Sequence, residues 1–594
     1  MSDTEDVNFP SQKELEREIS EYLSNKYGKK VRIISAGQFP MAGQAPAGDE
    51  EHAGQPAAVP PDFHFDLAPE ELIAHLDQYV VGQEEAKAIL ATKICTHFNR
   101  ISRSLSRPGG EAGSGRNVGR IKNNVLLIGP TGVGKTYLIK LIAQHIGVPF
   151  VKGDATKFSE TGYVGGDVED LIRDLVREAD NDLERARFGI VYLDEVDKIA
   201  GGVDRRGLDV SRSGVQRALL KPMEETEVEM KVPHDPIAMM EAVEHYRLTG
   251  KRQRKSINTR HILFIMSGAF SGLDEIIGRR LQQRSIGFEN TVAAAAPARP
   301  GALMARARAE DLVEYGFESE FIGRLPVLAV LSELSEDDLY EILSSPNSAV
   351  VVGKKQDFRA YGIELRFEDA ALRKLAALAA RESTGARALV SVMERVLLHF
   401  EKKLPSTDIR QLVVTPELVA DPAGELAKLL KDSRVRKRHS KKCEKLAAAE
   451  QERLMTFIRE RLGDYLENHD VLPTPERLRM MAMEVEAEDL EPAEVCERFI
   501  DLVALVNDRA RQVSRDCGLE LSFSEEAVDR LLARMPRSEE TVGEACDQVL
   551  QAMEYGLRLL SQRRRAPELV IPADGVDAPD SFINQVVNKT FKLE

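Results

Sequence analysis

The sequence predicts an α/β fold in which a parallel sheet lies between two layers of helices. One observation is a set of short apolar runs, VLLI, IVYL and ILFIM, each bounded by glycine or polar residues and separated from the next by helical patterns. Such runs are typical of strands that are buried on both faces. The second observation is the glycine-rich GPTGVGKT directly after the first run, because a phosphate-binding loop of this kind joins a strand to a helix.

The chain has 594 residues, which is more than one hydrophobic core organises, so several domains are expected. Composition and periodicity divide it as follows: an N-terminal region and flexible linker over 1–62, a large α/β domain over 63–328, a small mainly helical domain over 329–422, a charged helical connector over 423–488, and a helical C-terminal extension over 489–594.

Composition excludes several classes of protein. No apolar run approaches the ~18 residues of a membrane span, and the acidic N-terminus lacks the order of a targeting signal, so we expect no membrane partner and a cytoplasmic location. A net charge of −16 argues against nucleic acid as a partner, and the basic run 433–442 is interpreted as a solvated helix face. The five cysteines form no CxxC pair, so no zinc site is expected.

The phosphate loop indicates binding of ATP with Mg²⁺. Backbone N–H groups of a glycine-rich turn and the N-terminus of the following helix favour phosphate, Lys135 supplies a positive charge, and the Thr136 hydroxyl is a ligand for Mg²⁺. The expected nucleotide-binding residues are Gly129, Pro130, Thr131, Gly132, Val133, Gly134, Lys135 and Thr136.

The run IVYLDEVDK ends in two acids, which suit a hydrolytic site because metal and attacking water meet the γ-phosphate at strand carboxyl ends. Asp194 is the expected Mg²⁺-side carboxylate. Glu195 is the residue expected to orient or deprotonate the water. Ser267, at the end of ILFIMS, is either a γ-phosphate sensor or a serine that only forms hydrogen bonds at the end of its strand.

An internal repeat relates the C-terminal extension to the small domain. GIELRFEDAALRKL from Gly362 aligns with GLELSFSEEAVDRL from Gly518, and the later apolar, strand and proline positions agree after a shift of one residue. Two unrelated amphipathic hairpins would share the helical spacing. They would not share the strand, glycine and proline positions, so the extension is interpreted as a degenerate second copy of the small domain.

Over roughly residues 63–422 the chain resembles the ClpX-type AAA+ unfoldases. The motifs that carry the resemblance occur in the family's order: YVVGQEEAK, GPTGVGKT, GYVGGDVED, IVYLDEVDK, DVSRSGVQRALLK, ILFIMSGAFSGLD, SIGF, EFIGRLP and TGAR. The resemblance implies an AAA+ phosphate-loop ATPase domain with a small lid domain, and an ATP-dependent protein unfoldase and translocase.

The resemblance also implies roles for single residues. Arg324 looks like an arginine finger that reaches a neighbouring subunit's nucleotide, and Arg387 like a sensor from the lid. Tyr79, Val80 and Val81 would lie by the adenine ring. A finger acting between subunits requires a closed ring, which in this family is a homohexamer.

Two further loops match the family. Gly162, Tyr163, Val164 and Gly165 look like the pore loop that grips an unfolded polypeptide, although a tyrosine buried in a turn is the simpler reading of GYVG alone. A second pore segment departs from the family: Arg212 and Ser213, with Arg205 and Arg206, make the expected lower pore more basic and favour substrates with acidic tails.

The tripeptide Ile286, Gly287 and Phe288 looks like the loop that inserts into a ClpP-like peptidase ring. The expected partners are this peptidase, protein substrates and adaptors. Two alternatives stay open: a remodelling chaperone that works without a peptidase, and an inactive ring that serves as an adaptor. No set of protease catalytic residues is visible, so peptide cleavage would come from another subunit.

The resemblance fails at both ends. The family's N-terminal zinc domain needs four cysteines, and no cysteine precedes Cys95 here. In the second copy, Glu544 occupies the position of Arg387, and a carboxylate would repel a triphosphate. The extension is therefore expected to be an accessory, lid-like domain that does not sense nucleotide.

Overall fold

The structure, a computed structural model, describes residues 65–105, 122–158, 166–201, 210–230, 256–285, 303–382, 384–488, 490–534, 537–561 and 569–592. Within these ranges, no helix combines the length and apolar character that crossing a bilayer requires.

A five-stranded parallel sheet with strand order β2-β3-β6-β1-β7 lies at the centre of the large domain. Its strands are β1 (Val125–Ile128), β2 (Phe150–Asp154), β3 (Ile190–Asp194), β6 (Leu263–Gly268) and β7 (Val327–Val330). Side chains alternate between the two faces. Leu126 therefore packs in one core and Leu127 in the other. The predicted parallel sheet is confirmed, and its apolar runs are β1, β3 and β6.

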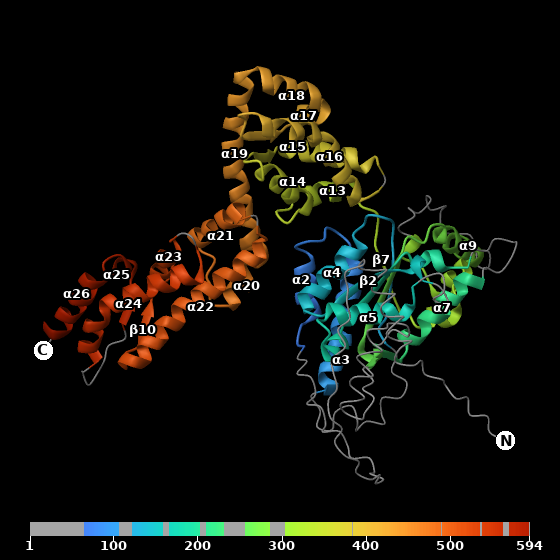
Figure 1. Cartoon of the computed structure of the whole chain (residues 1–594), viewed down its shortest axis with the longest axis horizontal. Coiled ribbons are helices and arrows are strands. Elements are labelled where there is room, and N and C mark those ends of the chain that lie inside the picture. Colours follow the sequence, from blue (N-terminus) through green and yellow to red (C-terminus); the bar gives the residue numbers. More distant parts are fainter. Residues whose placement is uncertain are drawn as a thin grey trace, which may run out of the picture.

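Helices cover both faces of this sheet (Figure 1). On one face pack α2 (Pro69–Leu76), α3 (Glu84–Leu105) and α4 (Lys135–Ile146). On the other pack α5 (Val168–Glu178), α6 (Leu183–Ala186), α7 (Val210–Met223), α9 (Leu273–Ser285), α11 (Ala309–Tyr315) and α12 (Ser319–Gly323), with the short antiparallel pair β4 (Glu227–Glu229) and β5 (Ser256–Asn258). This is the expected three-layer arrangement. All strands of the sheet present their carboxyl ends at one edge, where ligands bind in such folds.

A small, mainly helical unit follows, which we call the lid. It consists of α13 (Glu336–Ser344), α14 (Ala349–Arg359), β8 (Glu364–Phe367), α15 (Asp369–Ala380), α16 (Ala386–Lys403), β9 (Gln411–Val414), α17 (Pro416–Ala420) and α18 (Pro422–Lys431). β8 and β9 form a parallel pair, and apolar side chains of the strands and helices share one core.

The helix α19 (Ser433–Phe457) links the lid to the C-terminal unit, and Figure 1 shows it running along the lid toward α20 and α21. Near its start, the buried His439 accepts a hydrogen bond at Nδ1 from the backbone N–H of Val413, at 3.2 Å. Near its end, Leu454 and Met455 belong to the C-terminal core. The stretch that the sequence indicates as a charged connector thus contributes apolar side chains to two cores.

The C-terminal unit is a helical body with a two-stranded parallel sheet. After a π-helical turn (Ile458–Leu462) it comprises α20 (Gly463–Asn468), α21 (Pro475–Glu488), α22 (Pro492–Cys517), β10 (Leu521–Phe523), α23 (Glu525–Leu532), α24 (Glu539–Ser561), β11 (Leu569–Ile571), α25 (Ala573–Asp577) and α26 (Pro579–Lys592).

From α22 onward this unit repeats the element order of the lid from α14 onward. Each begins with a helix that ends before a glycine with positive φ, which is 69° at Gly362 and 68° at Gly518. The strand pairs share a register, since Leu365 opposes Leu412 and Leu521 opposes Leu569. A helix pair separates the strands in both units, and two further helices follow the second strand.

The five cysteines of the chain are all described, and none forms a disulfide. Four are buried, in α3 (Cys95), α19 (Cys443), α22 (Cys496) and α24 (Cys546), while Cys517 is half-buried. Burial is the main cause that raises the thiol pKa, to about 11 for Cys95 and to about 12 for Cys443. These thiols behave as small apolar groups.

Candidate functional site

The phosphate loop turns sharply between β1 and α4. Gly132 and Gly134 have φ of 81° and 91°, a region that residues with a Cβ rarely adopt, so the glycines at these positions follow from the backbone path. α4 begins at Lys135, and its first N–H groups face the loop. A turn of this shape before a helix N-terminus is suited to binding an anion.

Lys135 lies within the loop. Its ammonium donates hydrogen bonds to the carbonyl oxygens of Gly129 and Pro130, at 2.6 and 2.8 Å. Burial lowers the pKa of this lysine, the nearby carboxylates of Asp194 and Asp197 oppose that shift, and Arg387 adds to it. The positive charge is thus held in a partly desolvated place, where its attraction to a phosphate is stronger than in bulk water.

Four polar side chains meet where β3 and β6 end beside α4. The hydroxyl of Tyr192 lies 3.1 Å from Thr136 Oγ1 and 2.6 Å from Ser267 Oγ. Ser267 donates to Asp194 Oδ1 at 2.7 Å, and Thr136 lies 3.4 Å from Asp194 Oδ2. The structure therefore brings together three residues that the sequence singles out, and joins them through one that it did not.

The carboxylate of Asp194 is held ionised. Burial alone would raise its pKa, but the hydrogen bond from Ser267 and the Lys152 ammonium, 3.1 Å from Oδ2, together hold the pKa below its ordinary value. Tyr192 is fully buried, and burial raises the pKa of its phenol to about 12. At neutral pH the tyrosine hydroxyl therefore keeps its proton, while Asp194 can only accept hydrogen bonds.

Thr136 and Asp194 fit a bound Mg²⁺. A hydroxyl and an ionised carboxylate are the hard oxygen ligands that this ion prefers, and they lie on adjacent elements at the phosphate loop. These two residues would hold the ion together with the phosphates of a nucleotide, where it would neutralise charge on the phosphoryl oxygens. In the described ranges, no cluster of three or more His, Cys, Asp or Glu side chains is placed to hold a metal.

Glu195 follows directly and is exposed, in contrast to the half-buried Asp194. Its backbone is left-handed, with φ of 57° and ψ of 32°. The two acids thus differ in their surroundings: Asp194 belongs to the hydrogen-bonded cluster, and Glu195 is open to solvent.

The lid is bonded directly to the phosphate loop. The backbone N–H of Ala386, in the first turn of α16, donates to the carbonyl of Gly132 at 2.9 Å. A Cβ added to Gly132 would lie 2.0 Å from the carbonyl oxygen of Thr384, so the two backbones are as close as glycine allows. Arg387, one residue on, is exposed; its charge adds to the burial that lowers the pKa of Lys135 and opposes the burial that raises the pKa of Tyr192.

The three residues predicted to lie near adenine follow α2. Val80 is buried in the core beneath α4, while Tyr79 and Val81 are half-buried. The hydroxyl of Tyr79 donates to Glu491 Oε2 of the C-terminal unit at 3.0 Å. Its ring lies beside His75, whose own ring stacks on His145 with centroids 3.9 Å apart. The extension therefore contacts a residue that the resemblance places at the nucleotide.

Arg324 is half exposed at the end of α12, and its guanidinium forms an ion pair with Glu224 at 2.5 Å. The expected pore-loop residues, Gly162, Tyr163, Val164 and Gly165, lie outside the described residues, as do Arg205, Arg206 and the docking tripeptide Ile286, Gly287 and Phe288. Of the second pore segment, the side chain of Arg212 also lies outside them.

Sequence reasoning missed Tyr192 and Lys152. A signal for Tyr192 exists, because a hydroxyl two residues before Asp194 on a strand lies on the same face as that acid. Lys152 is paired with Tyr192 in the register of β2 and β3, and this pairing cannot be read from spacing along the chain.

Comparison with known proteins agrees with this geometry. Residues 120–328 match the family described as AAA domain (Cdc48 subfamily), and residues 334–401 match the C-terminal, D2-small domain, of ClpB protein. The chain is 40% identical over 356 residues to a protein of Methylococcus capsulatus named ATP-dependent Clp protease ATP-binding subunit ClpX 3; the match spans 59% of this chain and 80% of that relative. The phosphate loop, the acids at the strand end and the lid up to residue 401 are inside the matched families. The chain therefore belongs to the ClpX-type AAA+ ATPases.

Proposed function

We propose that this ATPase is a protein unfoldase that works as a ring of identical subunits, a homohexamer by its resemblance to the family. One observation carries the proposal: a phosphate loop, two acids at a strand end and the lid arginine Arg387 converge on one site, and the lid is hydrogen-bonded to the phosphate loop itself. Events at the phosphates would therefore be transmitted to the lid, and a lid that moves against the large domain can perform work on a substrate.

Within this site each residue has a distinct task. Lys135 and the loop N–H groups bind the phosphates, and Ser267 and Arg387 would sense the terminal phosphate from the sheet and from the lid. Glu195 orients the attacking water and accepts its proton, for which an exposed carboxylate beside Asp194 is suited.

Arg324 would complete the site of a neighbouring subunit. Its ion pair with Glu224 is about half exposed on both sides. Surface pairs of this kind contribute little to stability, so the guanidinium is free to exchange its partner for a phosphate. The arginine would then stabilise charge on the transferring phosphoryl group.

The proposal is tested by Arg324→Ala. We expect ATP hydrolysis to fall on the order of 1,000-fold while nucleotide binding is retained, because a finger acts on the transition state. Arg217→Ala is the matched control, since Arg217 also forms an exposed ion pair, with Glu318 at 3.1 Å. Normal hydrolysis by Arg324→Ala, or a protein that stays monomeric with ATP, would refute the ring.

The substrate would be an unfolded polypeptide gripped by Tyr163 and Val164, and the partner a ClpP-like peptidase that receives Ile286 and Phe288. The relative's printed name, a subunit of the Clp protease, supports this coupling. The alternative is a remodeller without a peptidase. Phe288→Ala distinguishes the two: coupling predicts that degradation stops while ATP hydrolysis and unfolding continue, with Asn290→Ala as the neighbouring control.

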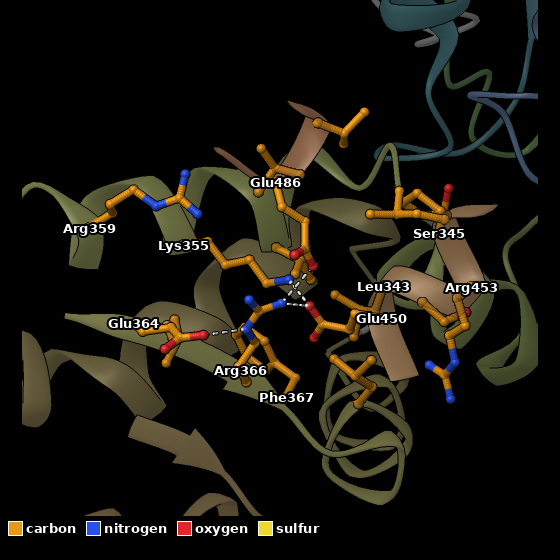
Figure 2. Close-up of a pocket in the computed structure, with 18 of the residues that line it drawn as sticks. Leu343, Ser345, Lys355, Arg359, Glu364, Arg366, Phe367, Glu450, Arg453 and Glu486 are labelled. Carbon is orange, nitrogen blue, oxygen red and sulfur yellow. Dashed lines mark hydrogen bonds and ion pairs between the residues drawn. The ribbon is translucent and has the colours of Figure 1, made fainter. Parts of the chain in front are cut away.

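The C-terminal unit would be an accessory lid that lacks nucleotide sensing, as Glu544 at the position of Arg387 suggests. It is held to the lid by a partly buried charge network shown in Figure 2. The Arg366 guanidinium contacts Glu364 on its own strand, Glu450 of α19 and Glu486 of α21, at 3.0, 2.5 and 2.9 Å. Lys355 of α14 also contacts Glu450, at 2.7 Å. Ion pairs between Lys355 and Arg366 of the lid and Glu450 and Glu486 of α19 and α21 therefore attach the C-terminal unit to the lid.

This role is tested by truncation. The cut belongs after Arg453, because α18 and the first half of α19 complete the lid core and a cut at residue 423 would expose it. We expect the shortened chain to hydrolyse ATP and to lose ring assembly or substrate choice. An enzyme unchanged in assembly, substrate range and ATP hydrolysis would contradict an accessory role.

A further inference from the structure

Tyr192 occupies an unusual place for a core residue. Its side chain is fully buried among apolar neighbours on β3, yet its hydroxyl contacts two residues with assigned chemistry, Thr136 at the start of α4 and Ser267 at the end of β6. A buried tyrosine needs one hydrogen-bond partner. Here both partners belong to the nucleotide site, and they come from different elements.

Counting protons fixes the direction of these hydrogen bonds. Each of the hydroxyls has one proton, and Asp194, as a carboxylate, only accepts. The Ser267 proton goes to Asp194 Oδ1 at 2.7 Å. Ser267 Oγ must therefore accept from Tyr192, and the Tyr192 oxygen is then left to accept from Thr136.

The proton of Thr136 has two acceptors in reach, and the distances favour one. Tyr192 lies 3.1 Å from Thr136 Oγ1, at the upper end of the usual range for hydroxyl donors, whereas Asp194 Oδ2 lies at 3.4 Å, well beyond it. The result is a one-way chain from Thr136 through Tyr192 and Ser267 to Asp194. Hydrogen bonds aligned in series strengthen one another in a low-dielectric interior.

We propose that Tyr192 is a positioning residue that orients the Thr136 hydroxyl for Mg²⁺ and couples it to Ser267. With its proton directed to Tyr192, the Thr136 oxygen keeps a lone pair available for a cation. The inference deepens the proposed chemistry of the same site and rests on Mg²⁺–nucleotide binding there. It adds a residue that acts through Thr136 and touches neither nucleotide nor metal.

Tyr192→Phe tests the proposal, with the affinity for a fluorescent ADP analogue measured in MgCl₂ and in EDTA. ADP has no γ-phosphate, so the sensor role of Ser267 does not enter. We expect affinity in MgCl₂ to fall on the order of tenfold, as for other residues that orient metal ligands, and the Mg²⁺ concentration for half-maximal binding to rise. Affinity in EDTA should match that of the unaltered protein, which would also verify that the nucleotide site is intact.

Tyr340→Phe is the matched control, because the Tyr340 hydroxyl donates to Asp369 at 2.5 Å in the lid, within a different core. It should lose stability without any change in Mg²⁺ dependence. Equal affinities of Tyr192→Phe and unaltered protein in MgCl₂, or equal losses in MgCl₂ and EDTA, would overturn the proposal.

Ser267→Ala provides a second arm should Tyr192→Phe fail to fold. Without the Ser267 acceptor, Tyr192 can turn its proton toward Thr136 and reverse the chain. Affinity for the ADP analogue should then fall in MgCl₂ and not in EDTA. Unchanged Mg²⁺ dependence in this variant would equally overturn the proposal, and loss of binding in both buffers would indicate failure of the nucleotide site itself.

Discussion

Glu195 is a glutamate with left-handed backbone geometry, a conformation that costs on the order of 1–3 kcal/mol for residues with a side chain. It is anchored from both sides, by β3 before it and by the buried Val196 after it. A strained backbone of this kind persists where the surrounding structure imposes it. Here the left-handed turn at Glu195 accompanies the change from the half-buried carboxylate of Asp194 to the exposed carboxylate of Glu195.

Glu195→Gln tests the role of this carboxylate. The amide has nearly the same shape but cannot accept a proton from water, so we expect ATP hydrolysis to fall at least about 100-fold, while ATP affinity stays within about twofold. Phosphate release and equilibrium binding measure the two effects. Glu227→Gln on the exposed edge of β4 is the control, and undiminished hydrolysis by Glu195→Gln would exclude it as the base.

His97 predicts a pH dependence of stability. Its ring is buried, Nε2 lies 3.0 Å from the carbonyl of His261, and burial lowers the pKa to about 4. The unfolded chain therefore binds more protons than the folded one between pH 6.5 and 4, so stability present above pH 6.5 is lost as pH falls. The full difference is about 3 kcal/mol.

His97→Gln should remove most of this acid sensitivity, since an amide can still donate to the carbonyl of His261 and does not titrate. Calorimetric unfolding at pH 7.5 and 4.5 measures it as a smaller drop in Tm. His399→Gln on the exposed face of α16 is the control. An acid-induced drop in Tm equal to that of the unaltered protein would assign the effect to other groups.

At this scale the sequence predicted the site residues that lie in recognisable motifs and missed Tyr192 and Lys152. Lys135, Asp194 and Thr136 follow from spacing within a motif, and the structure brings them together. Tyr192 and Lys152 depend on which strands are neighbours and in what register, and no local pattern carries that information.

At the scale of elements, the phosphate loop lies close against the segment that precedes α16. Gly385 has φ of 61° and ψ of −143°, and a Cβ there would lie 2.7 Å from the carbonyl oxygen of Gly132. The phosphate loop and the lid are therefore in direct backbone contact, with Gly132 on the side of the loop and Gly385 on the side of the lid.

Gly385→Ala should push the lid away from the loop. The unfavourable φ and the contact with Gly132 together cost on the order of 1–3 kcal/mol, and we expect nucleotide affinity to fall about tenfold. Gly353→Ala is the control, because Gly353 lies inside α14 with no atom within 4 Å of an added Cβ, and alanine there favours the helix. Equal nucleotide affinities for both variants would contradict the coupling.

The repeated element order was visible in the sequence because it rests on glycine, strand and proline positions, which are local. By contrast, the sequence did not show that α19 packs against both the lid core and the C-terminal core. Its sequence is strongly charged, and its apolar side chains serve the lid near one end and the C-terminal core near the other, so neither end gives a long periodic stripe.

At the scale of the whole molecule, the C-terminal unit makes contact with both parts of the ATPase. It is fixed to the lid through Arg366 and contacts the large domain through Glu491 and Tyr79. The extension therefore adds an indirect link between the lid and the large domain to their direct contacts at the phosphate loop and between Asn347 and Gln78. The large-domain contact could not be predicted from the sequence, because the two residues are far apart along the chain.

Arg366→Met tests whether these contacts act together. Removing Arg366 leaves Glu486, whose side chain is 25% exposed, without its guanidinium, which costs less than the roughly 3–5 kcal/mol of a fully buried pair. We expect faster amide hydrogen exchange in α21 and also around Tyr79. Arg395→Met, which breaks an exposed ion pair with Glu382, is the control. Faster exchange in α21 with no change around Tyr79 would show that the extension does not bridge the two.

The placement of the cysteines has a practical consequence. The buried thiols sit in separate bodies of the protein, Cys95 in the large domain, Cys443 where α19 meets the lid, and Cys496 and Cys546 in the C-terminal unit. A maleimide reagent can reach each of them only when its own body opens. Mass spectrometry of the labelled peptides during ATP turnover would then show in which order the large domain, the lid and the C-terminal unit open.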